Sequence, residues 1–266
     1  MQYTLALITG ASSGLGRDLA KLLARQHIAL ILHGREQHAL TELANDLSQM
    51  VAVDTLQADL LQKEGREKVL AAIREKSPDL VINNAGIGLY GEILTFPLEE
   101  QMNIVETNIT ALTQISIEGA RTLIQNKLEG TIVNISSVAG FFPYPTLSIY
   151  AASKSFVTNF SQGFDAEVKR LGVRVLTVCP GQIDTSFQRR ASKGYPQKTR
   201  PWVLSSERAA QLVWQKVVKK KKNSVIGFRY GFIAFVARYL LPRYLLEKIL
   251  RQGIKDRYPS KDLFFK

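Results

Sequence analysis

The sequence predicts an α/β protein in which one parallel sheet of about seven strands is covered by helices on both faces. Apolar segments of strand length alternate with helical patterns along the chain. Segments such as 28–32 and 131–135 are apolar on both faces, as strands inside a covered parallel sheet must be. The 266 residues suffice for one sizeable core, and no repeat or linker marks a boundary. We therefore expect a single doubly wound domain over residues 1–227, followed by a helical extension over 228–266.

The strands and helices are expected in regular alternation. Strands are predicted near residues 3–9, 29–33, 51–56, 79–83, 130–136, 173–179 and 223–227. Helical patterns fill the intervals, and the two longest cover about 97–126 and 150–171. In such sheets, ligands bind at the carboxyl ends of the strands. Polar residues and glycines that directly follow a strand are therefore the candidate site residues.

A glycine-rich turn joins the first strand to the first helix, with Gly10, Gly14 and Gly16 at its key positions. Glycine permits positive φ and a close approach of the backbone to a phosphate, whose charge the free N–H groups of the first helical turn bind. A plain tight turn is the alternative, but the position between strand and helix favours a dinucleotide site. The spacing Gly-x-x-x-Gly-x-Gly departs from the more widespread Gly-x-Gly-x-x-Gly.

Tyr150 and Lys154 lie four residues apart at the start of an expected helix, so both side chains project from one face. A nearby ammonium lowers the phenol pKa from its usual value of about 10, which makes tyrosine a usable acid near neutral pH. Such a pair is also common by chance on solvated helix faces. The pair therefore indicates a catalytic site only in combination with the other motifs of the chain.

The end of the second strand indicates which dinucleotide is bound. An acidic residue there would bond a ribose 2′-hydroxyl and repel a 2′-phosphate, but this strand ends in Gly34 and Arg35. A guanidinium suits a phosphate, and Gly34 leaves room for it. The sequence thus predicts NADP(H) in preference to NAD(H), the alternative being that Arg35 is only a surface residue.

Three further motifs complete a pattern. Asn83-Asn84-Ala85-Gly86 and Pro180-Gly181 each follow an expected strand, and Ser137 precedes Tyr150 by thirteen residues. With these motifs in this order, the chain resembles the short-chain dehydrogenase/reductases over roughly residues 1–225. The resemblance implies a Rossmann-like fold and hydride transfer between a nicotinamide and a carbonyl or alcohol. It also implies a homodimer or homotetramer that pairs through the two long helices.

The resemblance assigns roles to individual residues. Tyr150 would protonate the carbonyl oxygen, Ser137 would hydrogen-bond it, and Lys154 would lower the Tyr150 pKa and hold the nicotinamide ribose. Asn108 matches the family's asparagine at a helix kink, whose backbone holds a water linked to Lys154. The cofactor-binding residues would be Gly10, Ser12, Ser13, Gly14, Leu15, Gly16, Arg35, Asp59, Leu60, Asn84, Ala85, Gly86, Tyr150, Lys154, Pro180, Gly181, Ile183 and Thr185.

Other classes of protein fit less well. The segment 10–14 matches the Gly-x-Ser-x-Gly elbow of hydrolases. That chemistry requires a histidine late in the chain, but the three histidines, His27, His33 and His38, all follow closely behind the segment. They are also too few for a metal site, and Cys179 ends an apolar strand as a small buried residue. A non-catalytic cofactor-binding or membrane-associated scaffold on the same fold remains the alternative.

The net charge of +12 is concentrated at the C-terminal end. Residues 1–215 hold 21 basic and 20 acidic residues, whereas residues 216–266 hold 14 and 3. Apolar residues between these charges predict two short amphipathic helices over about 228–252, broken near Pro242. They either contact an anionic membrane surface or cover the substrate pocket or a subunit interface. No nucleic-acid motif accompanies the basic residues, and no signal peptide is recognised, so we expect a cytoplasmic protein, with possible peripheral contact at the inner membrane face.

The substrate site is expected to be apolar and aromatic. The contributing segments would be 141–144, Leu89-Tyr90 and the loop from Phe187 to Trp202. This composition favours a lipophilic ketone or aldehyde. Arg189 and Arg190 in the same loop are either partners of an acidic group or solvated surface residues.

Overall fold

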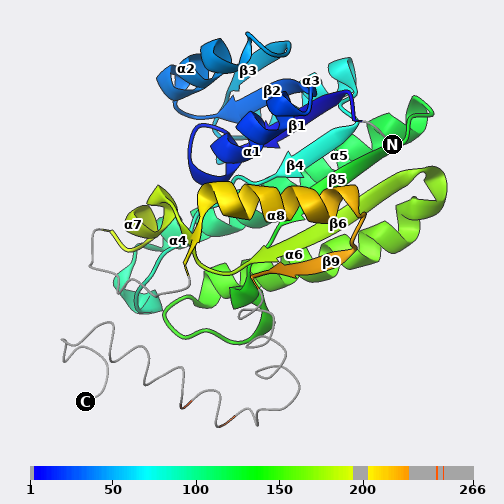
Figure 1. The fold of residues 1–266 in the computed structure, drawn as a ribbon. Coiled ribbons are helices and arrows are strands. Elements are labelled where there is room, and N and C mark those ends of the chain that lie inside the picture. Colours follow the sequence, from blue (N-terminus) through cyan, green and yellow to red (C-terminus); the bar gives the residue numbers. More distant parts are fainter. Residues whose placement is uncertain (1–2, 194–202, 228–243, 245–247, 249–266) are drawn as a thin grey trace.

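Seven parallel strands form the central sheet of the protein (Figure 1). The computed structural model describes residues 3–193 and 203–227, together with Tyr244 and Lys248. The strands of this sheet are β1 (Leu5–Thr9), β2 (Ala29–Gly34), β3 (Val53–Gln57), β4 (Leu80–Asn83), β5 (Gly130–Ile135), β6 (Val173–Pro180) and β9 (Asn223–Ile226). Their order across the sheet is β3-β2-β1-β4-β5-β6-β9. The predicted doubly wound parallel sheet is confirmed.

Helices cover both faces of the sheet. They are α1 (Gly14–Arg25), α2 (Gln37–Leu47), α3 (Lys63–Lys76), α4 (Leu98–Val105), α5 (Leu112–Gln125), α6 (Ser148–Val168), α7 (Ser186–Ala191) and α8 (Ser206–Val218). Leu19 of α1, Leu43 of α2 and Val213 of α8 belong to the apolar cluster on one face. Val69 of α3 and Ile115 of α5 belong to the cluster on the other. Figure 1 shows α1 and α8 on the opposite side of the sheet from α5 and α6.

The register of the sheet brings the candidate motifs to one edge. Ile8 pairs with Ile82, and Asn83 pairs with Asn134, so β1, β4 and β5 end at nearly the same level. Because all strands are parallel, the residues that follow them lie at the same carboxyl edge. The Asn83 amide donates to Ser116 and Asn134 in the buried space between sheet and helices, which fixes the end of β4.

Three features differ from the sequence-based expectation or add to it. The long helix expected over 97–126 is interrupted by a π-helical segment, Glu106–Ala111, between α4 and α5. Two short strands, β7 (Ile183–Asp184) and β8 (Leu204–Ser205), pair with each other after β6 and were not predicted. The short helix α7 after β7 was also missed, because six residues carry too little periodicity to be recognised.

The C-terminal extension falls mostly outside the described residues, so the helices predicted over 228–252 and the boundary at residue 227 stay predictions. The lysines at positions 219–222 precede and adjoin β9, and all four are exposed. Among the helices in the described ranges, none combines the length and hydropathy needed to cross a membrane.

Candidate active site

The glycine turn between β1 and α1 has the geometry that its sequence predicts. Gly10 and Gly14 have φ of +69° and +55°, in the left-handed region that side chains disfavour. A Cβ on Gly16 would lie 2.2 Å from the Gly10 carbonyl oxygen and 2.5 Å from Nδ2 of Asn84. Gly16 therefore packs beneath the turn, and its lack of a side chain lets the turn close.

Asn84 holds this turn from the neighbouring strand. Its Nδ2 donates to the carbonyl oxygens of Thr9 and Gly10 at 3.0 and 3.2 Å. In return, the Thr9 hydroxyl accepts from the backbone N–H groups of Asn84 and Ala85, each at 3.0 Å. Two motifs more than 70 residues apart thus form one rigid unit.

The N-terminus of α1 opens into a cavity of about 650 Å³. Ser13 precedes the helix, and its side chain makes no capping hydrogen bond, while Ser13, Gly14 and Leu15 all line the cavity. Backbone N–H groups at a helix N-terminus bind anions when no side chain caps them. The turn therefore fits the phosphates of a dinucleotide.

Eighteen of the predicted site residues line this same cavity. They are Gly10, Ser12, Ser13, Gly14, Leu15, Arg35, Asp59, Leu60, Asn84, Ala85, Gly86, Ser137, Tyr150, Lys154, Pro180, Gly181, Ile183 and Thr185. The two predicted residues outside the lining are Gly16, which packs under the turn, and Asn108, which is fully buried behind the cavity wall.

The end of β2 forms one wall of the cavity. Arg35 is exposed and lines the cavity beside Gly34 and Ser12. Asp59, which follows the neighbouring strand β3, also lines the cavity, and its carboxylate accepts from the backbone N–H of Leu61 at 3.1 Å. His33, which sequence reasoning did not assign, is buried here, and its Nε2 bonds the Ala58 carbonyl at 3.2 Å. Burial lowers the pKa of His33 to about 4, so the ring is neutral at physiological pH.

Tyr150 and Lys154 project from α6 into the cavity, and both are almost fully buried, with 9% and 4% of their surface exposed. The Lys154 ammonium lies 5.7 Å from the centroid of the Tyr150 ring and donates to the Ile135 carbonyl at 3.0 Å. Ser137, at the end of β5, reaches the same phenol. Its Oγ also accepts from the N–H of Ala139 at 3.2 Å. The helix spacing places Tyr150 and Lys154 on one face of α6, and the end of β5 brings Ser137 to the same part of the cavity.

The structure does not bear out the expected fall in the Tyr150 pKa. Burial raises the pKa of Tyr150 to about 12, and the hydrogen bond from Ser137 offsets only part of this rise. Burial also lowers the pKa of Lys154 to about 8. The expectation was wrong because it considered only the attraction between the two groups, whereas desolvation of both dominates in this site.

Asn108 lies in the π-helical segment and binds the loop after β4. Its Oδ1 accepts from the N–H of Ile87 at 2.9 Å, and its Nδ2 donates to the carbonyl of Ile87 at 2.9 Å and to Ser153 Oγ at 3.1 Å. A Cβ on Gly86 would lie 3.3 Å from Asn108 Oδ1 and 3.4 Å from Lys154 Nζ. The helix interruption therefore places Asn108 directly behind the backbone that faces Lys154.

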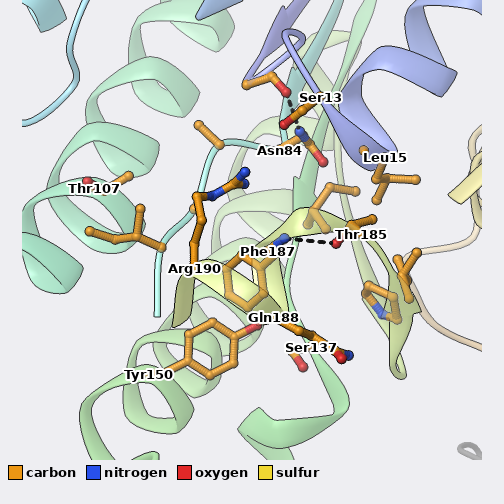
Figure 2. A pocket seen from close by; sticks show the side chains of 18 of the residues that line it. Ser13, Leu15, Asn84, Thr107, Ser137, Tyr150, Thr185, Phe187, Gln188 and Arg190 are labelled. Atoms are coloured by element: carbon orange, nitrogen blue, oxygen red, sulfur yellow. Dashed lines mark hydrogen bonds between the residues drawn. The ribbon is translucent and has the colours of Figure 1, made fainter. Parts of the chain in front are cut away.

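Apolar and aromatic side chains surround the Tyr150 end of the cavity. Phe187 of α7 packs against Tyr150 with ring centroids 5.7 Å apart, as Figure 2 shows from close by. Leu147 and Ala139 pack against Tyr150 as well, and Tyr90 and Tyr144 border this cluster. Leu147 and Thr107 were missed from the sequence, although Leu147 directly precedes α6 and could have been found from that position.

A strand–turn–helix anion site and a buried phenol–ammonium pair thus share one cleft, which is the arrangement of an α/β oxidoreductase. The family model described as short chain dehydrogenase matches residues 4–196. The chain belongs to this family, as its sequence motifs predicted.

Known relatives agree with this assignment. The chain is 35% identical over 220 residues to sulfoacetaldehyde reductase 2 of Chromohalobacter salexigens, covering 79% of this chain and 86% of the relative. Among solved structures, a short-chain dehydrogenase from Sphingobium yanoikuyae in complex with NADPH has 30% identity and a TM-score of 0.80, with coverage of 98% and 100%. A bulky-bulky ketone specific alcohol dehydrogenase from Comamonas testosteroni has 28% identity and a TM-score of 0.77, with coverage of 100% and 98%.

Proposed function

We propose that this protein is an NADP(H)-dependent oxidoreductase that interconverts a lipophilic ketone or aldehyde with its alcohol. The observation that carries the proposal is the position of the Tyr150 hydroxyl. Tyr150 lines one cavity together with the glycine turn, and Phe142, Leu147 and Phe187 line the same cavity. A carbonyl carbon bound there would face the cofactor on one side and apolar side chains on the other.

The residues of the chain handle the proton and the developing charge. When bound in the cavity, NADPH would be the source of the hydride for the carbonyl carbon. The Tyr150 hydroxyl donates its proton to the carbonyl oxygen, and Ser137 donates a hydrogen bond to the same oxygen as its negative charge develops. Lys154, whose pKa is lowered to about 8, stabilises the phenolate that remains and is placed to hold the nicotinamide ribose. In the direction of alcohol oxidation, the same phenolate accepts the proton.

Three features support a preference for NADP(H) over NAD(H). Arg35 lines the cavity with a guanidinium that makes no ion pair with any residue in the described part of the chain. A Cβ on Gly34 would lie 3.2 Å from the hydroxyl of Ser12, which also lines the cavity, so glycine leaves this wall open. The related Sphingobium enzyme was solved with NADPH. The test is Arg35→Asp, which should weaken NADPH binding by about ten-fold or more and spare NADH. Equal affinity of the unmodified protein for both dinucleotides would contradict the proposed preference.

The lining of the substrate half favours a bulky apolar substrate. Val138, Ala139, Phe142, Leu147 and Phe187 present carbon rather than charge. In this respect, the site agrees better with the bulky ketones of the Comamonas enzyme than with the small sulfonated aldehyde of the Chromohalobacter enzyme. A panel of aryl ketones, aliphatic aldehydes and sulfoacetaldehyde, each assayed with NADPH, would separate the two substrate classes.

The central test is Tyr150→Phe. The aromatic ring and its packing on Phe187 remain, but the proton is lost, so turnover should fall by at least about 100-fold. NADPH affinity, measured by fluorescence titration, should stay within a few-fold of the parent protein. Near-normal turnover of the purified variant would refute the catalytic assignment. Loss of turnover with binding retained also separates the enzyme from a scaffold that only binds the cofactor.

We also propose that two subunits pair through α4, α5 and α6. Met102, Ile117 and Phe156 on these helices are 45%, 36% and 39% exposed, and Phe156 stacks on Phe160 at 5.8 Å. Such apolar surface on long helices is typical of subunit interfaces. Sedimentation at micromolar concentration should show a dimer or tetramer, and a monomer alone would contradict the proposal.

The exposed lysines at 219–222 support a second, independent proposal, peripheral contact with anionic lipid at the inner membrane face of the cell. The protein should sediment with phosphatidylserine vesicles at low salt and be released at high salt. Replacement of the four lysines by glutamine should abolish sedimentation, whereas no binding at low salt would refute this contact.

A further inference from the structure

Arg190 lines the cavity, and α7, which carries it, is held in place at both ends. At the start of the helix, Thr185 caps α7 by accepting from the N–H of Phe187 at 3.3 Å, and its Cγ2 lies 3.0 Å from the Cβ position of Gly14. At the other end, the N–H of Tyr90 donates to the Ala191 carbonyl at 2.8 Å. Lys193, two residues after the helix, forms an ion pair with Glu100. The helix is thus fixed across the mouth of the site.

Two side chains of α7, Phe187 and Arg190, extend to different parts of the cavity. Phe187 packs on the Tyr150 ring, whereas the Arg190 side chain extends away from Tyr150 toward the end of the cavity where Ser13 and Asn84 lie (Figure 2). The Arg190 guanidinium donates to the Ser186 hydroxyl on its own helix. Within the described residues, it has no carboxylate partner. A guanidinium aimed at an anion site without an acidic partner is positioned to bind a phosphate.

The charge distribution in the cavity supports this reading. Burial, followed by the positive charges of Arg35 and Arg189, lowers the pKa of Arg190. Arg35, which directly follows β2, and Arg190 of α7 both line this cavity. Two like charges that face one cavity repel each other in the free protein, and an anion placed between them relieves this repulsion.

We infer that Arg190 binds a phosphate group of the dinucleotide from the side opposite the glycine turn. This inference rests on the proposed function, because it requires a phosphorylated dinucleotide in the cavity. The same phosphate contact would also affect the substrate half of the site. Phe187 and Arg190 share one short helix, so a phosphate contact at Arg190 positions Phe187 over Tyr150, and the bound cofactor shapes the substrate pocket.

The test measures binding directly, by fluorescence titration of NADPH and of NADH, with the unmodified protein and three variants. Arg190→Ala should weaken binding by about ten- to hundred-fold, the loss that follows removal of one charge-assisted hydrogen-bond donor. Arg190→Lys keeps the positive charge but not the planar guanidinium, so this variant should lose less affinity for the dinucleotide than Arg190→Ala. Arg189→Ala is the matched control, because Arg189 is exposed, as Arg190 is, but lies outside the cavity lining. The thermal midpoint of each variant checks that it folds.

The pattern of losses identifies the phosphate. A loss for NADPH alone assigns Arg190 to the 2′-phosphate, together with Arg35, and equal losses for both dinucleotides assign it to the pyrophosphate; either result supports the inference. Unchanged affinity for both, with or without a rise in KM for the carbonyl substrate, would overturn it. Failure of the unmodified protein to bind either dinucleotide would instead refute the proposed function itself, so the two failures are distinct.

Discussion

Replacement of Asn108 by leucine should destabilise the protein and slow its reaction, because this one side chain satisfies both backbone groups of Ile87. Asn108 is fully buried, and its three hydrogen bonds to Ile87 and Ser153 are 2.9 to 3.1 Å long. Leucine has a similar size but no polar atom, so the N–H and the carbonyl of Ile87 would lose their partners.

The expected magnitude follows from these two backbone groups. Each buried polar group left without a partner costs about 1–3 kcal/mol. Ile87 also lines the cavity, where water can replace part of the loss, so we expect about 2–4 kcal/mol in total. For a chain of this size, each kcal/mol lowers the Tm by about 2–4 °C, which gives a fall on the order of 10 °C.

Calorimetry and urea titration measure this loss, and the reaction rate provides a second readout. Asn108 lies behind Gly86, whose Cβ position is 3.4 Å from Lys154 Nζ, so movement of this loop should lower kcat more than it raises the Kd for NADPH. Asn126→Leu is the matched control, because Asn126 is exposed at the end of the same helical run and its side chain makes a single exposed hydrogen bond, to Ser77. Its loss should change stability by about 1 kcal/mol or less. A Tm of Asn108→Leu within 2 °C of the parent, a limit of about one kcal/mol at most, would refute the reasoning.

Two other predictions concern the cofactor end of the cavity. Stability should decrease as the pH falls from 6.5 toward 4, because burial lowers the pKa of His33 to about 4 and the unfolded chain then binds a proton that the folded chain does not. His33→Gln should remove this contribution, and urea titrations at pH 7 and pH 5 should show a smaller difference for the variant; an identical difference would contradict the assignment. Gly16→Ala should weaken NADPH binding by at least about ten-fold, because its Cβ would lie 2.2 Å from the Gly10 carbonyl oxygen and must displace the turn. Gly163→Ala, whose Cβ would meet nothing within 4 Å, should leave binding unchanged, and fluorescence titration of both variants decides the matter.

Local sequence patterns were sufficient to predict most of the fold and the residues of the cleft. Strand and helix positions follow from apolar periodicity, and parallel strands carry whatever follows them to one edge of the sheet. For this reason the glycine turn, Asn83, Ser137 and Pro180 could be placed at one edge of the sheet before their contacts were known. The spacing of Tyr150 and Lys154 placed both residues on one helix face in the same way.

Tertiary structure alone decided how these groups behave, because burial and partners depend on segments distant in the sequence. The spacing of Tyr150 and Lys154 indicates that the two groups attract each other, but it does not show how far they are desolvated. Desolvation raises the pKa of Tyr150 to about 12 and lowers the pKa of Lys154 to about 8. Nothing local to Arg190 indicates that α7 crosses the cleft, since Tyr90, Glu100 and Gly14 hold that helix in place. Sequence periodicity reports which residues face a core, whereas the direction of a polar side chain is set by the packing of every element around it.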